Sequence, residues 1–140
     1  MKLMSNDFKH NELLSSKFGY RRENVSPHLE WKDFHVDTKS FALICDDPDA
    51  GNWIHWAVIN IPQDISEISQ GGPVPGIELE NDFGQRGYGG PAPPSGTHRY
   101  IFKIFALDTE KLEDVTKSNF TTKVKVHVID SAKIIGLYKA

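Results

Sequence analysis

Three short segments rich in apolar, aromatic and β-branched residues constrain the fold of this chain more than any other feature. They span residues 41–45, 52–61 and 98–107. The first stops at acidic and proline residues, and the second is followed by Pro62. The third is the clearest, because tyrosine, isoleucine and phenylalanine fill five of its ten positions. Such residues favour strands, so each segment predicts a β-strand.

The length and the charge limit the class of protein. A chain of 140 residues is expected to form one domain over residues 1–140 and to bury a hydrophobic core without disulfide bonds. The net charge of −3 provides no basic surface to neutralise nucleic-acid phosphates. The sequence therefore argues against a nucleic-acid partner.

Three further features predict a cytoplasmic protein. Cys45 is the only cysteine, so no disulfide forms within the chain and a reducing compartment fits best. Residues 1–8 contain no apolar stretch long enough for a signal peptide. No segment approaches the roughly 18 apolar residues of a membrane span.

A long segment between the second and third predicted strands has no clear periodicity. Residues 63–97 contain most of the glycine and proline. A structureless loop of that length is uncommon and usually means a functional loop or short elements that the pattern does not reveal. Residues 24–31 form an extended segment that is broken by Pro27.

The C-terminal segment fits two kinds of secondary structure. The valines at every second position of residues 124–128 argue for a strand. Apolar side chains also recur at three- and four-residue spacing from Val124 to Ile135, which argues for a helix that Gly136 would end. The pattern alone leaves both open.

Polar and aromatic residues lie in pairs at the ends of the predicted strands. The members of each pair are two positions apart: Asp47 and Asp49, Trp53 and His55, and His98 and Tyr100. Side chains two apart on a strand point to the same face of a sheet. If the three strand ends are neighbours, these six side chains converge on one site.

These residue types suit a pocket for an anion. A histidine can offer an N–H donor, and a nearby carboxylate can fix its tautomer. We therefore expect His55 and His98 to donate to the anion and Asp47 to orient one of them. Tyr100 would add a hydroxyl group, and Trp53 would form an apolar wall.

The remaining site residues come from the glycine-proline loop and from the first pair. Gly89 and Gly90 allow backbone N–H groups to approach a ligand closely, and Pro91 stiffens the loop. Asp49 would shape the rim or meet a cation on the ligand, so a zwitterion such as phosphoethanolamine would fit. No catalytic residue, bound metal or cofactor is predicted.

Other interpretations of the same residues remain open. A histidine beside a tryptophan is often a structural residue, and Asp-Pro-Asp is often only a turn. Two aspartates and two histidines could also hold the divalent metal of a hydrolase, although their spacing matches no tight ligand motif. Ser95 precedes His98 by three residues, but the Gly-x-Ser-x-Gly motif of many hydrolases is absent.

Several motifs occur in a fixed order along the chain. They are Asn-Val-Ser-Pro-His-Leu-Glu-Trp at residues 24–31, Asp-Pro-Asp-Ala at 47–50, Trp-Ile-His-Trp-Ala-Val-Ile-Asn-Ile-Pro at 53–62, Asn-Asp-Phe-Gly at 81–84, Tyr-Gly-Gly-Pro-Ala-Pro-Pro at 88–94, Gly-Thr-His-Arg-Tyr at 96–100 and the segment 127–138. Together they resemble the phosphatidylethanolamine-binding protein family, in its bacterial and archaeal, Raf-kinase-inhibitor-like branch.

The resemblance implies a mainly β fold, in which a large antiparallel sheet packs against a smaller one. It implies one or two peripheral helices, including one at residues 127–138. It also implies a non-enzymatic protein with a small pocket for phosphate-like anions or phospholipid head groups. Carried over residue by residue, the pocket uses Asp47, Asp49, Trp53, His55, Gly89, Gly90, Pro91, His98 and Tyr100.

Two properties of the family bear on this chain differently. The family's pocket loop often has a cis peptide bond at a proline, where this chain has Gly51. Because a cis bond without proline costs several kcal/mol, the loop is expected to turn differently or to be trans. Some relatives inhibit kinases or proteases, so an inhibitor that acts on a protein partner is an alternative function for this chain. The family also implies a homodimer.

Overall fold

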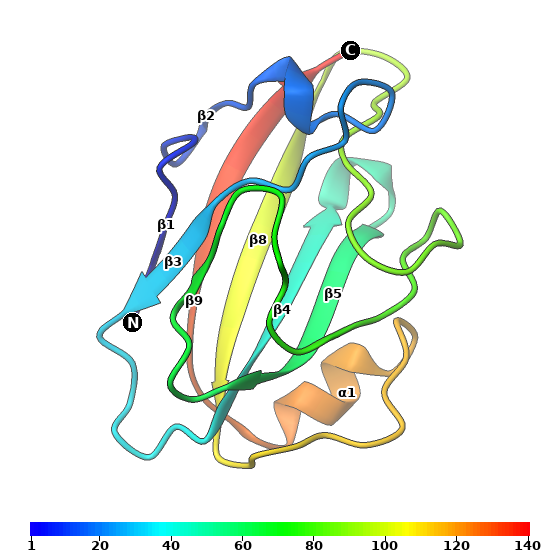
Figure 1. The fold of residues 1–140 in the computed structure, drawn as a ribbon. Helices are drawn as coiled ribbons and strands as arrows, with labels where there is room; N and C mark the ends of the chain where they lie inside the picture. Colours follow the sequence, from blue (N-terminus) through cyan, green and yellow to red (C-terminus); the bar gives the residue numbers. More distant parts are fainter.

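The computed structural model describes residues 1–140 as two β-sheets that pack face to face (Figure 1). The smaller sheet has the order β1 (Lys2–Met4), β3 (Leu29–Lys32), β6 (Glu67–Ile68). The larger sheet has the order β2 (Glu12–Leu13), β9 (Val128–Lys139), β8 (Thr97–Leu107), β4 (Ser40–Asp47), β5 (Trp53–Pro62), β7 (Ile77–Glu78). Every pair of strands is antiparallel except β2 and β9. The predicted fold class is confirmed.

Three short helical elements complete the fold. They are the 3-10 helices η1 (Ser16–Phe18) and η2 (Pro48–Ala50) and the α-helix α1 (Phe120–Lys125). Figure 1 places η2 and α1 at opposite ends of the larger sheet. No helix in the structure has the length and apolarity that crossing a bilayer requires.

The larger sheet is buried on both faces, which explains the unbroken apolar runs in its central strands. On β4, Phe41 and Leu43 face the core between the two sheets. Ala42 and Ile44 face a second cluster that includes Phe120 of α1. A strand with two buried faces needs apolar residues at every position. The three predicted strands are thus confirmed as β4, β5 and β8.

The C-terminal segment is a strand, and the helix expected at residues 127–138 is wrong. β9 pairs with β8 from Leu107↔Val128 to Thr97↔Lys139. Strand is therefore correct for residues 128–139, because pairing with β8 outweighs the helical spacing of the apolar residues. The valine alternation did not mark this strand, because Val124 lies in α1, Val126 caps that helix and only Val128 lies in β9. Gly136 does not end a helix. It lies in mid-strand, where a Cβ atom would come within 2.7 Å of the Leu14 side chain. A helix does lie near the C-terminus, but at Phe120–Lys125.

The segment 63–97 contains short elements that the pattern did not reveal. β6 and β7 lie within it, and an isolated bridge joins Glu80 to Arg86. Its second half passes over the end of the larger sheet at which β4 stops and β8 begins (Figure 1). The segment therefore covers the region where the predicted site residues lie.

Candidate functional site

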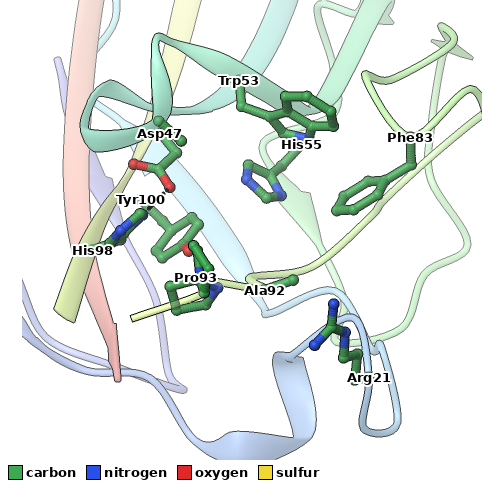
Figure 2. A pocket seen from close by; sticks show the side chains of 11 residues that line it. Arg21, Asp47, Trp53, His55, Phe83, Ala92, Pro93, His98 and Tyr100 are labelled. Atoms are coloured by element: carbon green, nitrogen blue, oxygen red, sulfur yellow. Dashed lines mark hydrogen bonds and ion pairs between the residues drawn. The ribbon is translucent and has the colours of Figure 1, made fainter. Parts of the chain in front are cut away.

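A cavity of about 240 Å³ opens where β4 ends and where β5 and β8 begin (Figure 2). It is lined by Arg21, Asp47, Ala50, Trp53, His55, Phe83, Ala92, Pro93, Pro94, His98 and Tyr100. The structure thus brings together five of the nine predicted residues: Asp47, Trp53, His55, His98 and Tyr100. It leaves the other four outside the lining: Asp49, Gly89, Gly90 and Pro91.

Strand pairing explains why five of the residues meet. Asp47 pairs with Trp53 across β4 and β5, and Asp46 pairs with Ile101 across β4 and β8. The ends of the three strands are therefore neighbours, which is the condition under which the paired side chains at these ends meet in one site. A register shift in the β4–β5 pairing between Cys45 and Asp46 adjusts the strand just before the site.

Asp47 orients one of the two histidines. It is 2% exposed, and its Oδ2 atom accepts a hydrogen bond of 2.7 Å from Nδ1 of His98. The other carboxylate oxygen accepts from the backbone N–H of Asp49. With Nδ1 of His98 fixed on Asp47, Nε2 is the ring nitrogen that remains for a ligand.

His55 is oriented by the backbone instead. Its ring is almost fully buried, and Nδ1 lies 2.7 Å from the carbonyl oxygen of Gly89 and 3.1 Å from that of Gly90. Carbonyl oxygens only accept, so Nδ1 carries the hydrogen. Burial lowers the pKa of His55 below its ordinary 6.5, against the smaller opposing effect of the carbonyls. The ring is therefore neutral at pH 7, and Nε2 offers a lone pair rather than the donor that we expected.

Tyr100 contributes a hydroxyl group that makes no hydrogen bond of normal geometry within the chain, although Asp47 and the backbone of Ala92 lie close to it. Its ring packs edge-on against His55, with 5.1 Å between the ring centroids, and its Oη atom is buried. Burial raises the pKa of Tyr100, and the Asp47 carboxylate raises it further. The hydroxyl therefore keeps its hydrogen. A buried donor without a partner beside a cavity is a feature that a ligand can satisfy.

The rest of the lining is an aromatic wall and one cation. Phe83 packs edge-on against Trp53 and His55, and it stacks on Tyr20 with ring centroids 3.9 Å apart. Arg21 forms no ion pair within the chain, and Figure 2 shows its guanidinium group directed toward the hollow. It is the one cation in the lining other than the histidines.

Asp49 meets a cation of the chain itself rather than one on a ligand. Its carboxylate accepts two hydrogen bonds from the Arg99 guanidinium, of 2.9 and 3.1 Å, and one from the Arg99 backbone N–H. These bonds lower the pKa of Asp49 to about 2. The pair joins η2 to β8 beside the cavity and not in its lining, so the structure argues against Asp49 meeting a cation on a ligand. That Asp49 shapes the rim stays a prediction.

Gly89 and Gly90 hold His55 through their carbonyl groups and offer no free N–H donors. The N–H of Gly89 donates to the carbonyl of His55, and that of Gly90 donates to Oδ1 of Asn24. The carbonyl of Pro91 accepts from the N–H of Tyr20. A Cβ atom on Gly90 would lie 1.9 Å from the carbonyl oxygen of Phe18, so only glycine fits there. Gly89, Gly90 and Pro91 therefore support the pocket through their backbone groups and do not line it.

The loop at Gly51 turns differently from the family pattern, as expected. Gly51 has a φ of 64° and a ψ of 34°, in the left-handed region, and follows the last residue of η2. Its peptide bond is trans. The turn leaves Ala50 in the lining of the cavity.

The two aspartates and two histidines do not form a metal-ligand set. One group of three potential ligands exists elsewhere, made by His28, Glu30 and Glu67. There Nδ1 of His28 accepts a hydrogen bond from the N–H of Asn6, so Nε2 carries the hydrogen and lacks a lone pair for a metal. Neither cluster therefore supports a metal-dependent hydrolase.

A family model described as "Phosphatidylethanolamine-binding protein" matches residues 4–139. The chain belongs to the phosphatidylethanolamine-binding protein family. Similar proteins include a "UPF0098 protein" of Aquifex aeolicus, 41% identical over 99% of this chain and 88% of that protein. A "UPF0098 protein" of Methanothermobacter thermautotrophicus is 39% identical over 99% of both chains. "UPF0098 protein YbhB" of Escherichia coli has the same identity and coverage.

Solved structures of the family agree with the fold. YbcL of E. coli, described as a new member of the mammalian family, superposes with a TM-score of 0.93 at 31% identity and covers 99% of this chain and 98% of its own. A family homolog from Chlamydia trachomatis superposes with a TM-score of 0.92 at 32% identity, over 99% and 97% of the two chains. At a coarse level, membership of the phosphatidylethanolamine-binding protein family supports a binding protein rather than a classical enzyme.

Sequence reasoning missed two residues of the lining that carry chemistry. Phe83 lies in the Asn-Asp-Phe-Gly motif, so the motif was a signal for it. Arg21 lies in a loop between η1 and β3 and belongs to no periodic pattern. Contacts between segments far apart in sequence place this loop at the cavity, and such contacts leave no local signal.

Proposed function

We propose that this member of the family is a non-enzymatic protein that binds a small phosphate-like anion in the cavity, either free or as part of a phospholipid head group. One observation carries the proposal: four polar side chains whose hydrogen-bonding or charge capacity is not fully used inside the chain line one small cavity. They are Arg21, His55, His98 and Tyr100. Polar groups without partners are costly when they are buried or half-buried, as His55, His98 and Tyr100 are, and the exposed Arg21 adds a positive charge. Their convergence therefore favours an anionic ligand.

The geometry favours the phosphate part of the ligand over an amine. Asp49, the carboxylate that was expected to meet an ammonium group, is paired with Arg99. Asp47 accepts from His98 and from a backbone N–H. Phosphate and phosphoethanolamine should therefore bind with similar affinity, in the micromolar-to-millimolar range, or roughly −4 to −8 kcal/mol.

Isothermal titration calorimetry with both compounds tests the proposal. Replacing His55 and His98 by alanine removes two of the four polar groups, so the affinity should fall at least roughly tenfold. Lys117→Gln, a charge change outside the cavity, serves as the matched control and should leave the affinity unchanged. If the double variant keeps its fold and titrates like the parent, the site is assigned wrongly.

Other properties of the protein stay predictions. A cytoplasmic location rests on the single, buried Cys45, whose pKa burial raises well above its ordinary value, so that it remains a thiol. A protein partner and a homodimer rest on the family alone.

A further inference from the structure

The lone pair on Nε2 of His55 restricts which anions can approach it. Two backbone carbonyls, of Gly89 and Gly90, keep the hydrogen on Nδ1. An anionic oxygen that carries no hydrogen would therefore face another acceptor, which is repulsive. A close contact requires one proton between the two atoms, supplied by the ligand or by the solvent.

Building on the proposed function, we infer that the pocket binds inorganic phosphate or a phosphomonoester together with one proton, held between Nε2 of His55 and a ligand oxygen. A phosphomonoester brings this proton itself when it binds as the monoanion. A phosphodiester has no P–OH group, so the proton must come from solvent to the buried ring, where burial disfavours it. The pocket thereby selects phosphomonoesters over phosphodiesters, so among the ligands of the proposed function it favours free phosphate and phosphomonoesters over the phosphodiester head group of most phospholipids.

Titratable or charged groups face His55 from each element around it. They are Asp47 on β4, His98 and Tyr100 on β8, Asp82 in the loop after β7, and Arg21 in the loop after η1. Asp47 and Asp82 favour a protonated ring, but burial has the larger effect in the empty cavity. His98 is the other histidine beside the ligand, and its Nε2 has no partner because Nδ1 is fixed on Asp47. The test must therefore separate the two histidines.

Calorimetric titration with methyl phosphate, in two buffers of different ionisation enthalpy, counts the protons that binding takes up. The second pKa of a phosphomonoester is about 6, so the ligand is a dianion at pH 8 and a monoanion at pH 5. We expect uptake of about one proton per ligand at pH 8 and close to none at pH 5, with affinity falling roughly tenfold between pH 7 and pH 8. Dimethyl phosphate, which differs by one methyl group, should bind roughly tenfold more weakly at pH 6.

Two matched variants assign the proton. His55→Asn retains a donor near the position of Nδ1 and removes Nε2, so uptake at pH 8 should disappear. His98→Asn retains the donor to Asp47 and should still show uptake of about one proton, at reduced affinity. The proton count of the parent and the comparison with dimethyl phosphate test the inference even if neither variant folds.

Different failures have different meanings. If the parent binds methyl phosphate at pH 8 without taking up a proton, the inference is overturned and the proposed function stands. The same holds if dimethyl phosphate binds as tightly as methyl phosphate, or if uptake is lost in His98→Asn and kept in His55→Asn. If methyl phosphate does not bind at any pH from 5 to 8, the proposed function and this inference both fail.

Discussion

Two hollows on this protein differ in size and in the state of their polar groups. The candidate site has a volume of about 240 Å³, whereas a hollow between β7 and residues 112–118 has about 550 Å³. In the larger hollow, Lys117 lies 3.3 Å from Asp82 and 3.5 Å from Glu80, and Arg86 donates to the carbonyl of Glu78. Its cations are therefore already satisfied within the chain.

In the smaller cavity, the groups that a ligand needs are still unsatisfied. The Oη atom of Tyr100 and the Nε2 atoms of His55 and His98 have no partner in the chain, and Arg21 has no ion pair. The volume of a hollow therefore does not by itself identify a binding site. What distinguishes the smaller cavity is the hydrogen-bonding capacity that folding leaves unused.

The largest effect on the smaller cavity is expected from a change in the loop that holds His55. In Gly90→Ala the new Cβ would lie 1.9 Å from the Phe18 carbonyl oxygen, so the backbone must shift. We expect the free energy of unfolding to fall by about 3 kcal/mol or more and phosphate binding to be lost. Urea denaturation and calorimetry measure the two effects.

Gly51→Asn is the control for that change. Asparagine tolerates the left-handed conformation, and no atom lies within 4 Å of the position where its Cβ would be. Its stability should stay within about 1 kcal/mol of the parent. If Gly90→Ala is as stable as Gly51→Asn and still binds phosphate, the loop does not hold the pocket as described.

Removing the Tyr100 hydroxyl tests whether a polar group without a partner in the chain serves binding and not stability. Tyr100→Phe deletes a buried hydroxyl that has no partner, so stability should be unchanged or slightly higher. Phosphate affinity should fall roughly five- to tenfold, because the ligand loses a donor.

Ser40→Ala should show the reverse behaviour. The Ser40 hydroxyl donates to the Thr109 carbonyl at 2.6 Å, far from the cavity, so its loss should cost about 1 kcal/mol of stability. Phosphate affinity should stay the same. A loss of stability in Tyr100→Phe without a loss of affinity would mean that the hydroxyl has a structural role.

Cations at the two hollows should also differ in their effect on binding. Arg21→Gln should reduce phosphate affinity roughly three- to fivefold, with the effect shrinking as salt is added, because an exposed charge is screened. Lys117→Gln, in the larger hollow, should not change affinity. Equal losses in both variants would indicate a diffuse electrostatic effect instead of a site.

The smallest effect is expected at the Asp49–Arg99 pair on the rim. In Arg99→Leu the pKa of Asp49 should rise from about 2 toward its ordinary 3.8, because the guanidinium that lowers it is gone. Because its pKa is lowered in the folded state, the Asp49 carboxylate stabilises the fold at pH values above 3.8, and this stabilisation is lost as the pH falls toward 2. The free energy of unfolding of the variant should therefore differ from that of the parent mainly above pH 4. An NMR titration of the Asp49 carboxyl carbon measures the shift. Phosphate affinity at pH 7 should be unchanged, and a large loss would place the pair in the site after all.

The central strands could be predicted from the sequence, and the last one could not. β4, β5 and β8 are continuous apolar runs because both faces of the larger sheet are buried. The apolar residues of β9 fit a strand and a helix alike, and its long pairing with β8 decides between them. That pairing joins residues far apart in the sequence, so a local pattern does not contain it.

In the candidate site too, the residues on strands could be predicted and those in loops could not. Asp47, Trp53, His55, His98 and Tyr100 could be predicted because a strand alternates its side chains and the strand ends are neighbours. The other predicted positions lie in loops, whose direction depends on partners that the pattern does not show. Arg99 turns Asp49 away from the cavity, and Asn24 takes the N–H of Gly90.

Histidine NMR during a phosphate titration tests the central claim most directly. We expect the ring signals of His55 and His98 to shift together and to saturate with a single dissociation constant. Those of His28 and His127, which lie outside the cavity, should not move. If the signals of His55 and His98 remain unchanged at saturating phosphate, or if each follows a different dissociation constant, the two histidines do not form one anion site.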